Sequence, residues 1–171
     1  MGKDVARPMN DGTQEQEMIA PALEWRVQCF DELDPATLYA LLAARVDVFV
    51  VEQDCPYPEL DGRDADALHL SAWQDGALAA YARLVPPGGR FVEPSIGRVL
   101  TTAGFRGTGL GRVLMQRAID AVDAKWPGHA IRVSAQQHLE RFYGSLGFVA
   151  DSAVYDEDGI PHVDMLRAMQ P

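Results

Sequence analysis

The segment that decides the fold is Arg106-Gly107-Thr108-Gly109-Leu110-Gly111. Three glycines in six residues let the backbone turn tightly, and the turn leads directly into an amphipathic helix. The first N–H groups of a helix have no intrahelical partner and lie at the positive end of its dipole. The segment therefore predicts an anion site suited to a phosphate or pyrophosphate, and Arg112 adds positive charge beside it.

Two common phosphate-binding loops do not fit the residues around these glycines. A Walker-type loop needs Gly-Lys-Ser/Thr, but Gly111 is followed by Arg112-Val113. A dinucleotide-binding loop needs Gly-x-Gly-x-x-Gly close after a strand, whereas residues 102–106 separate the glycines from the strand-like run 96–101. A glycine-rich turn without any ligand is the remaining structural alternative.

Length and charge narrow the class of protein. The chain has 171 residues, enough for one well-buried domain, and a formal net charge of −10. Nonspecific nucleic-acid binding requires a basic face, so we expect no nucleic-acid partner. The most apolar run, residues 38–51, is shorter than the ~18 residues of a membrane span and is interrupted by Arg45 and Asp47. We therefore expect no membrane partner.

Cysteine usage and the N-terminal residues indicate a cytoplasmic protein. Cys29 and Cys55 have neither a metal-binding spacing nor the number needed for a disulfide framework. No apolar core follows the basic residues near the N-terminus, so no secretory signal is expected. Residues 1–22 are polar and aperiodic, and we expect a flexible tail there, followed by one domain over residues 23–171.

Hydrophobic patterning predicts the order of the helices and strands. Asp34 and Pro35 predict the start of a helix. Its buried stripe is expected to be Leu38, Leu41, Leu42, Val46 and Phe49. Strands are expected over residues 24–30, 67–73, 77–85, 96–101, 131–135, 148–155 and 162–169, the second and third of them as a hairpin around Gln74-Asp75-Gly76. Helices are expected over residues 109–125 and 138–146, the latter capped by Gly147. This order predicts a single mixed α/β (α+β) domain.

A second motif, one helix and one strand after the glycine segment, narrows the family. It is Leu139-x-x-Phe142-Tyr143-x-x-Leu146-Gly147-Phe148. The two motifs together resemble the pyrophosphate loop and the Leu-Tyr-x-x-x-Gly-Phe segment of the GCN5-related N-acetyltransferase (GNAT) superfamily. The segments that resemble its ElaA-type branch are residues 49–57, Asp61-Gly62, His69, residues 80–83 and residues 156–162. The resemblance thus covers nearly the whole chain after the tail.

The resemblance implies a fold and a cosubstrate. The fold would be a mixed, mostly antiparallel sheet flanked by helices, with central strands that splay apart to bind CoA. The cosubstrate would be acetyl-CoA, with pantetheine along the strand ending at Thr101 and pyrophosphate on the glycine segment, and no metal is implied. The implied cofactor-binding residues are Val99, Leu100, Thr101, Arg106, Gly107, Thr108, Gly109, Leu110, Gly111, Arg112 and Gln136.

Catalysis by this route needs an acid and a base. The resemblance implies that Tyr143 protonates the departing CoA thiolate, although its spacing alone fits a core aromatic equally well. Some relatives place a glutamate about a dozen residues before that tyrosine, but Ile131-Arg132 stands in this zone. The remaining candidates for the base are Glu52, Asp61, His69 and His162, or a chain of water molecules. A covalent acyl carrier at Cys55 is the less favoured alternative, since a lone thiol beside a proline is usually inert.

The predicted function is transfer of acetyl from acetyl-CoA to an amine by direct attack in a ternary complex. The alternative is an acyl-CoA-binding sensor or partner module with little catalysis. Six acids in residues 52–66 and three in residues 156–158 predict an acidic rim and a cationic small-molecule or peptide amine as acceptor. The sequence leaves the oligomeric state open, a homodimer included.

Overall fold

The structure is a computed structural model that describes residues 22–169. Its strands are β1 (Glu24–Cys29), β2 (Leu68–Gln74), β3 (Ala77–Val85), β4 (Ser95–Thr101), β5 (Ile131–Gln136), β6 (Phe148–Ala150), β7 (Tyr155–Glu157) and β8 (Ile160–Arg167). Its α-helices are α1 (Pro35–Val46), α2 (Leu110–Lys125) and α3 (Glu140–Gly144). Short helical turns cover Phe30–Glu32, Asp47–Glu52, Ala103–Phe105 and Gln137–Leu139. The predicted tail over residues 1–22 lies outside the described residues, except for Ala22.

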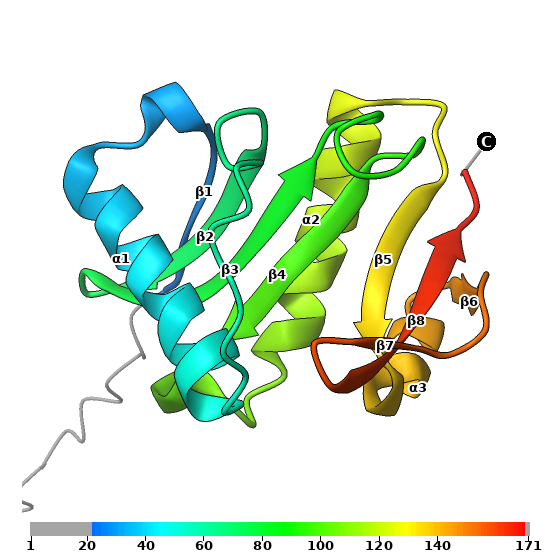
Figure 1. Cartoon of the computed structure of the whole chain (residues 1–171). Helices are drawn as coiled ribbons and strands as arrows, with labels where there is room; N and C mark the ends of the chain where they lie inside the picture. The colour runs from blue at the N-terminus through cyan, green and yellow to red at the C-terminus, as the bar shows by residue number, and fades with distance from the viewer. Residues whose placement is uncertain (1–21, 170–171) are drawn as a thin grey trace, which may run out of the picture.

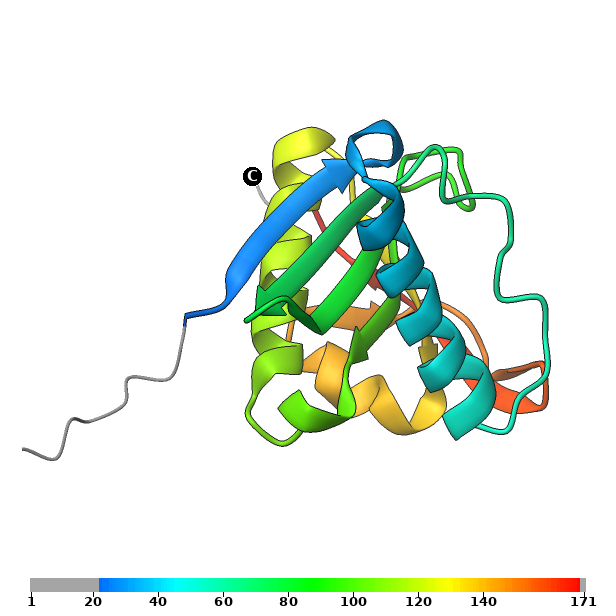
Figure 2. The same ribbon diagram turned by 90° about the vertical axis from the view of Figure 1, so that its left-hand side faces the viewer.

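Among the described residues, the strands form one sheet in the order β1-β2-β3-β4-β5-β8-β6, with β7 paired to β8. β4 and β5 are parallel to each other, and the other neighbouring strands are antiparallel. Figure 1 shows α1 in front of the first half of the sheet and α2 behind it. Figure 2, turned by 90°, shows the sheet between these two helices. The mixed, mostly antiparallel sheet flanked by helices confirms the predicted fold.

Two apolar clusters hold these layers together. The larger cluster joins α2 to the sheet and includes the fully buried Leu114 and Met115 together with Leu84. The smaller one joins Leu41 of α1 to Tyr81 and Leu100 on the opposite face. Burial of apolar surface on both faces is the main favourable contribution to such a layered fold.

The local signals that predicted two elements are visible in the structure. Asp34 caps α1, because its Oδ1 accepts hydrogen bonds from the amides of Ala36 and Thr37, each at 2.9 Å. The β2–β3 hairpin turns through Asp75 and Gly76, which have φ angles of 51° and 78°. Positive φ at both central residues is typical of the tight hairpin turn that Asp-Gly favours. Both predictions are confirmed.

The predicted apolar stripe of α1 is wrong at its C-terminal end. Val46 is 38% exposed, whereas the neighbouring Arg45 is 0% exposed. The helix then continues as a π-helical turn, Asp47–Glu52, which changes the face that each later residue presents. A periodicity of 3.6 residues cannot anticipate that a charged side chain is buried because partners from a distant loop surround it.

The C-terminal third is more broken than the pattern predicted. The helix expected over residues 138–146 is a 3-10 turn followed by α3, which ends at Gly144 with Ser145 as its C-cap. Gly147 does not cap that helix directly, but its φ of 89° turns the chain into β6. The strand expected over residues 148–155 is split into β6 and β7, which both pair with β8. Residues 151–154, which begin with Asp151 and Ser152, belong to neither strand.

Candidate active site

The sheet opens between its two parallel strands. Ser95 of β4 pairs with Arg132 of β5, and the amide of Arg132 donates to the carbonyl of Pro94 at 3.0 Å. Beyond this point the strands separate (Figure 1). A cavity of ≈ 730 Å³ lies here, lined by residues of both strands and of α3. The predicted splay of the central strands is confirmed.

The register of β4 and β5 orients this cavity. Ser95 and Arg132 form the one pair between these two strands, and two residues further along each strand lie Gly97 and Ser134. Val99, Leu100, Thr101, Arg106 and Gln136, all predicted to contact the cofactor, line the end near the glycine segment. The other end is lined by loop and hairpin residues that include Arg63, Arg90, Phe91 and Glu157. The cavity therefore runs from Arg106, the first residue of the glycine segment, past the splay, to a polar opening. The other predicted cofactor residues of this segment, residues 107–111, and Arg112 do not line it.

A β-bulge interrupts β4 in the middle of the cavity wall. Tyr81 pairs with Leu100 but Arg83 pairs with Gly97, so β4 carries one residue more than β3 in this stretch. Arg98 has a φ of 53°, a left-handed backbone conformation that residues other than glycine rarely adopt. A bulge leaves its extra residue out of the ladder, so its backbone is free to meet a ligand. No signal in the sequence predicted the bulge at Arg98.

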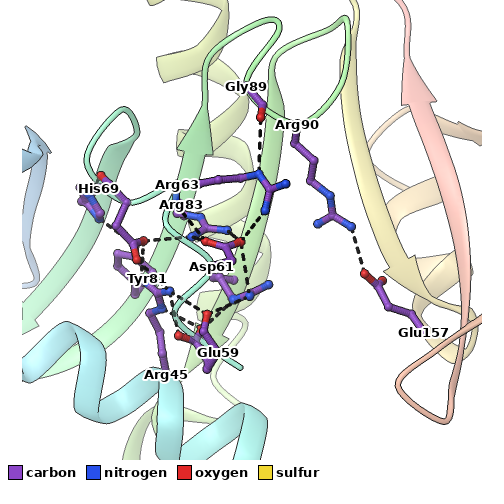
Figure 3. A network of polar contacts seen from close by, with 12 residues as sticks. Arg45, Glu59, Asp61, Arg63, His69, Tyr81, Arg83, Gly89, Arg90 and Glu157 are labelled. Carbon is purple, nitrogen blue, oxygen red and sulfur yellow. Dashed lines mark hydrogen bonds and ion pairs between the residues drawn. The ribbon is translucent and has the colours of Figure 1, made fainter. Parts of the chain in front are cut away.

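A buried ion-pair network supports the bulge from the side of α1 (Figure 3). Glu59, 4% exposed, accepts from Nε and Nη2 of Arg45 at 2.8 Å each and from Nε of Arg98 at 2.6 Å. Arg83, 1% exposed, donates to both carboxylate oxygens of Asp61 at 2.7 and 2.6 Å. Paired charges with several hydrogen bonds are the form in which ions are tolerated in a protein interior.

This network changes the interpretation of the acidic loop. Three of the six acids in residues 52–66, namely Glu59, Asp61 and Asp64, bond arginines of the sheet and of α1. They are not free charges on a rim, as the sequence had suggested. Arg63 is the one arginine of the loop itself, and Arg45, Arg83 and Arg98 from elsewhere in the chain also pair with its acids. The free acidic charge at the cavity mouth is therefore much smaller than predicted.

The glycine segment has the geometry of an open anion site. Gly107 and Gly109 have φ angles of 76° and 81°, and Gly109 is the N-cap of α2, with no side chain that caps the helix. A Cβ atom built on either glycine meets nothing within 4 Å, so the segment is open to a ligand. Arg106 is fixed at the cavity end, donating to the carbonyl of Thr101 at 3.0 Å and to Glu52 at 2.8 Å. Arg112 donates to Ser145 at 2.6 Å and adds a cation beside the helix N-terminus.

Comparisons with known proteins decide the family. The family model of the acetyltransferase (GNAT) domain matches residues 37–168. The chain belongs to the GNAT acetyltransferase family. ElaA of Escherichia coli is 41% identical over 147 residues, covering 85% of this chain and 96% of that protein. A UPF0039 protein of Mycobacterium tuberculosis is 43% identical over 141 residues, covering 80% of this chain and 87% of the relative.

Solved structures of GNAT proteins agree with this placement. An acyl-CoA N-acyltransferase from Pseudomonas aeruginosa is 48% identical, with a TM-score of 0.83 over 86% of this chain and 100% of that one. The crystal structure of Escherichia coli ElaA is 40% identical, with a TM-score of 0.81 and the same coverage. The predicted ElaA-type resemblance is confirmed.

Tyr143, the predicted acid, is placed by α3 in the cavity wall. It lines the cavity but is only 7% exposed, packed at edge angles against Phe142 and Phe148. Burial raises the pKa of its phenol to about 12. The phenol therefore holds its proton at neutral pH, as a proton donor must.

The four predicted base candidates are separated by the structure. Glu52 lines the cavity and is paired with Arg106, at the end near the glycine segment. Asp61 lines the opposite end, where hydrogen bonds from Arg83 outweigh burial and hold its pKa well below its usual range. An acid that releases its proton so readily is a poor base. Neither residue has the surroundings of a general base.

The two histidines differ most. His69 is 1% exposed and does not line the cavity; its Nδ1 bonds the hydroxyl of Tyr81 at 2.8 Å, and its Nε2 bonds the carbonyl of Asp64 at 3.0 Å. Burial lowers its pKa. His162 lines the cavity, and its Nδ1 donates to the carbonyl of Ile160 at 2.8 Å, which leaves Nε2 as the proton acceptor of the neutral ring. Of the two histidines, His162 alone lines the cavity, and His69 is buried away from it.

Two further predictions concern Gln136 and Cys55. Gln136 donates to Gln53 at 3.1 Å across the cavity wall, so its amide is already oriented in the protein alone. Cys55 is 7% exposed, and its Sγ lies 3.5 Å from the carbonyl of Asp158. Cys29 and Cys55 are both free thiols.

Residues 22–169 contain no group of three or more His, Cys, Asp or Glu side chains placed to hold a metal ion. In the same part of the chain, no helix has both the length and the apolar character needed to cross a membrane.

Proposed function

We propose that this protein transfers the acetyl group of acetyl-CoA to an amine by direct attack in a ternary complex. The observation that carries the proposal is the cavity between β4 and β5, which starts at Arg106 of the glycine segment and passes Tyr143 and the bulge at Arg98. The family, and the relative described as an acyl-CoA N-acyltransferase, support the same chemistry. That the acyl group is acetyl and that the acceptor is an amine are both part of the proposal.

The cosubstrate would lie along the cavity in one direction. The amides of residues 106–111 and the guanidinium of Arg112 would bind the pyrophosphate, because a helix N-terminus and a cation both favour negative charge. Pantetheine would follow the backbone of β4 from Thr101 to Val99, facing Gln136 on β5. The thioester would then reach the bulge at Arg98, where backbone N–H groups outside the ladder could bind the oxyanion of the tetrahedral intermediate.

The chemistry needs two proton transfers. The nitrogen of the acceptor attacks the thioester carbon, an N–C bond forms, and the C–S bond breaks. His162 Nε2 takes the proton from nitrogen, and Glu157, 3.8 Å away, would stabilise the protonated ring. Tyr143 gives its proton to the departing sulfur and is reprotonated from solvent, and His162 releases to solvent the proton that it took from nitrogen. The products are CoA and the N-acetylated amine.

A cationic acceptor is supported by a smaller set of acids than the sequence suggested. Glu157 and Asp158 line the open end of the cavity, at the turn between β7 and β8. Arg90 donates to Glu157 at 3.1 Å and partly compensates its charge. We therefore propose a cationic amine on the basis of this turn, rather than of residues 52–66.

A sensor or partner module that binds acyl-CoA without catalysis is the second candidate. Its support is the absence of a carboxylate where some relatives have their base: Ile131 is buried and Arg132 is held by Glu93 at 3.0 Å and by Asp151 at 2.8 Å. The two functions are separated by incubating the protein with acetyl-CoA and a panel of amines while measuring free CoA thiol. Amine-dependent thiol release supports the enzyme; CoA binding without any release supports the module.

A further inference from the structure

Three hydrogen-bonded side chains, Ser134, Tyr155 and Asp164, form a polar row that ends in the cavity wall. Ser134 of β5 lines the cavity and is hydrogen-bonded to the hydroxyl of Tyr155, which donates to Oδ1 of Asp164 at 2.9 Å. The register places Ser134 directly opposite Asp164, and Tyr155 opposite His162. Directly opposed residues project from the same face of a sheet. Ser134, Tyr155 and Asp164 therefore lie with His162 on the face that borders the cavity.

The direction of these hydrogen bonds follows from the chemistry of the groups. A carboxylate can only accept, so Tyr155 uses its single proton on Asp164. The oxygen of Tyr155 is then an acceptor for the hydroxyl of Ser134, and Ser134 spends its proton on that bond. What Ser134 presents to the cavity is therefore an oxygen with lone pairs and no hydrogen to donate. Burial raises the pKa of Tyr155, and the bond to Asp164 adds to this rise, while the bond with Ser134 opposes it; the pKa is raised on balance, so the phenol remains protonated at neutral pH and the direction of these hydrogen bonds persists.

The position of Ser134 fits the reacting nitrogen. Ser134 and Gly97 each lie two residues beyond the Ser95–Arg132 pair, before the bulge at Arg98, and so on the acceptor side of the proposed pantetheine path. Because the proposed thioester position is at the Arg98 bulge, which directly follows Gly97, Ser134 faces that position rather than the pantetheine. On the same face, the ring of His162 is stacked on Tyr155 with centroids 6.1 Å apart. The proposed base and the exposed oxygen thus flank one point in the cavity.

We propose that Ser134 binds the acceptor nitrogen by accepting one of its N–H groups and thereby selects primary amines. This inference rests on the function proposed above and adds the acceptor class to it. A primary amine has two hydrogens: one stays on Ser134 and directs the lone pair toward the thioester, and the other passes to His162 as the N–C bond forms. A secondary amine has only one, so it cannot keep the bond to Ser134 and also lose its proton. An alcohol has the same deficiency.

The test compares a primary amine that the panel identifies as an acceptor with its N-methyl derivative. For the wild-type protein, kcat/KM should favour the primary amine by roughly 10-fold or more, the effect of leaving a buried hydrogen-bonding group unpaired. Ser134→Ala should lower kcat/KM for the primary amine by roughly 10- to 100-fold. The ratio of kcat/KM between the primary amine and its N-methyl derivative should then fall to the value that their difference in size alone produces. The Kd of CoA should be unchanged. Ser134→Thr keeps the hydroxyl and should restore most of the activity.

Tyr155→Phe is a second variant in case Ser134→Ala fails to fold. It removes the group that fixes the proton of Ser134, so it should reduce the preference for the primary amine in the same direction but less strongly. Tyr39→Phe is the matched control, since Tyr39 is 77% exposed and outside the cavity. An active protein whose amine preference is unaltered by Ser134→Ala would overturn this inference alone. A wild-type protein that binds CoA but acetylates no amine would overturn the proposed function, and the role of Ser134 with it.

Discussion

Arg98 and Glu59 are joined by a 2.6 Å ion pair that fixes a left-handed residue in the wall of the cavity. Arg98 also donates from Nη2 to the main-chain oxygen of Glu59 at 3.1 Å, and its guanidinium lies 5.6 Å from the centre of the Tyr57 ring. Backbone strain of this kind persists where surrounding contacts hold it. The buried network therefore positions the bulge, and with it the backbone that would face the thioester.

Substitution at Arg98 can separate the strain from the ion pair. Arg98→Ala and Arg98→Gly both remove the contacts with Glu59, but only glycine relieves the left-handed conformation. Arg98→Gly should therefore be the more stable of the two by about 1–2 kcal/mol, the reverse of the usual order in a strand. Urea unfolding measures the difference. If Arg98→Ala proved the more stable variant, φ at this position would not be constrained as described.

Glu59→Gln should destabilise the fold severely. It leaves Arg45, which is fully buried, and Arg98 without their shared carboxylate, and breaking a buried ion pair from one side costs about 3–5 kcal/mol. Glu93→Gln is the control, because Glu93 accepts two hydrogen bonds from Arg132 but lies nearer the surface. Its effect on the free energy of unfolding should be much smaller. Equal losses for both variants would show that burial of the network contributes nothing special.

The same network predicts how stability depends on pH. For Asp64, as for Asp61, burial alone would raise the pKa, but hydrogen bonds from arginines lower it below its usual value. Groups whose pKa is depressed by folding stabilise the protein above the pKa of the unfolded chain, about 3.9 for Asp. This stabilisation is lost as the pH falls through that value toward the folded pKa. Thermal unfolding from pH 7 to pH 3 should show Tm falling below about pH 4.5, with a weaker fall in Asp61→Asn.

A ligand-induced rise in Tm tests the glycine segment. CoA and acetyl-CoA should raise Tm by mass action, since they would bind the folded chain alone. Gly109→Glu should abolish the rise, because a carboxylate at the N-terminus of α2 would repel the pyrophosphate. Gly76→Glu is the matched control: Gly76 has a φ of 78°, close to the 81° of Gly109, but lies in the β2–β3 turn. A Tm that responded to ATP or NAD and not to CoA would contradict the site.

Tyr143→Phe tests the acid. The phenol acts only as thiolate departs, so its loss should lower kcat by ~10²–10⁴-fold while the Kd of acetyl-CoA changes little. Steady-state kinetics and calorimetry on the variant and on Tyr39→Phe measure the two quantities. An unchanged kcat would reduce Tyr143 to a packing residue.

The charge of the acceptor is tested by ionic strength. A cationic amine should have a higher kcat/KM than a neutral amine of similar size at low salt, and the advantage should shrink as salt screens the cavity mouth. Glu157→Gln should reduce the advantage, whereas Asp66→Asn, which makes the same change of charge at an exposed position outside the cavity, should not. No advantage at low salt would rule out steering by the β7–β8 turn.

The sequence predicted the parts of this fold that depend on local signals. The cap at Asp34, the Asp75-Gly76 turn and the glycine segment each depend on a few adjacent residues, and each is where it was expected. Resemblance of two motifs to a known family then supplied the splay between β4 and β5, which no local pattern contains.

What the sequence could not predict depends on residues far apart in the chain. Arg45 is 14 residues from Glu59, and Glu59 is 39 residues from Arg98, so the burial of these charges has no periodic signature. The acids of residues 52–66 therefore predicted a solvated rim, although half of them form ion pairs with arginines of the sheet and of α1. The alignment of Ser134, Tyr155 and Asp164 likewise follows from the pairing of β5, β7 and β8, which is set by the whole sheet.

The fate of a labelled acetyl group tests the proposed transfer most directly. The protein is incubated with a primary cationic amine and acetyl-CoA that carries the label in its acetyl group. The label is then followed in the amine, in the protein and in acetate released by hydrolysis. Direct transfer predicts one labelled N-acetyl amine for each free CoA thiol and no label on the intact protein. Label retained on Cys55 would contradict direct attack, and bound CoA with no labelled amine from any acceptor would contradict the assignment of an acetyltransferase activity.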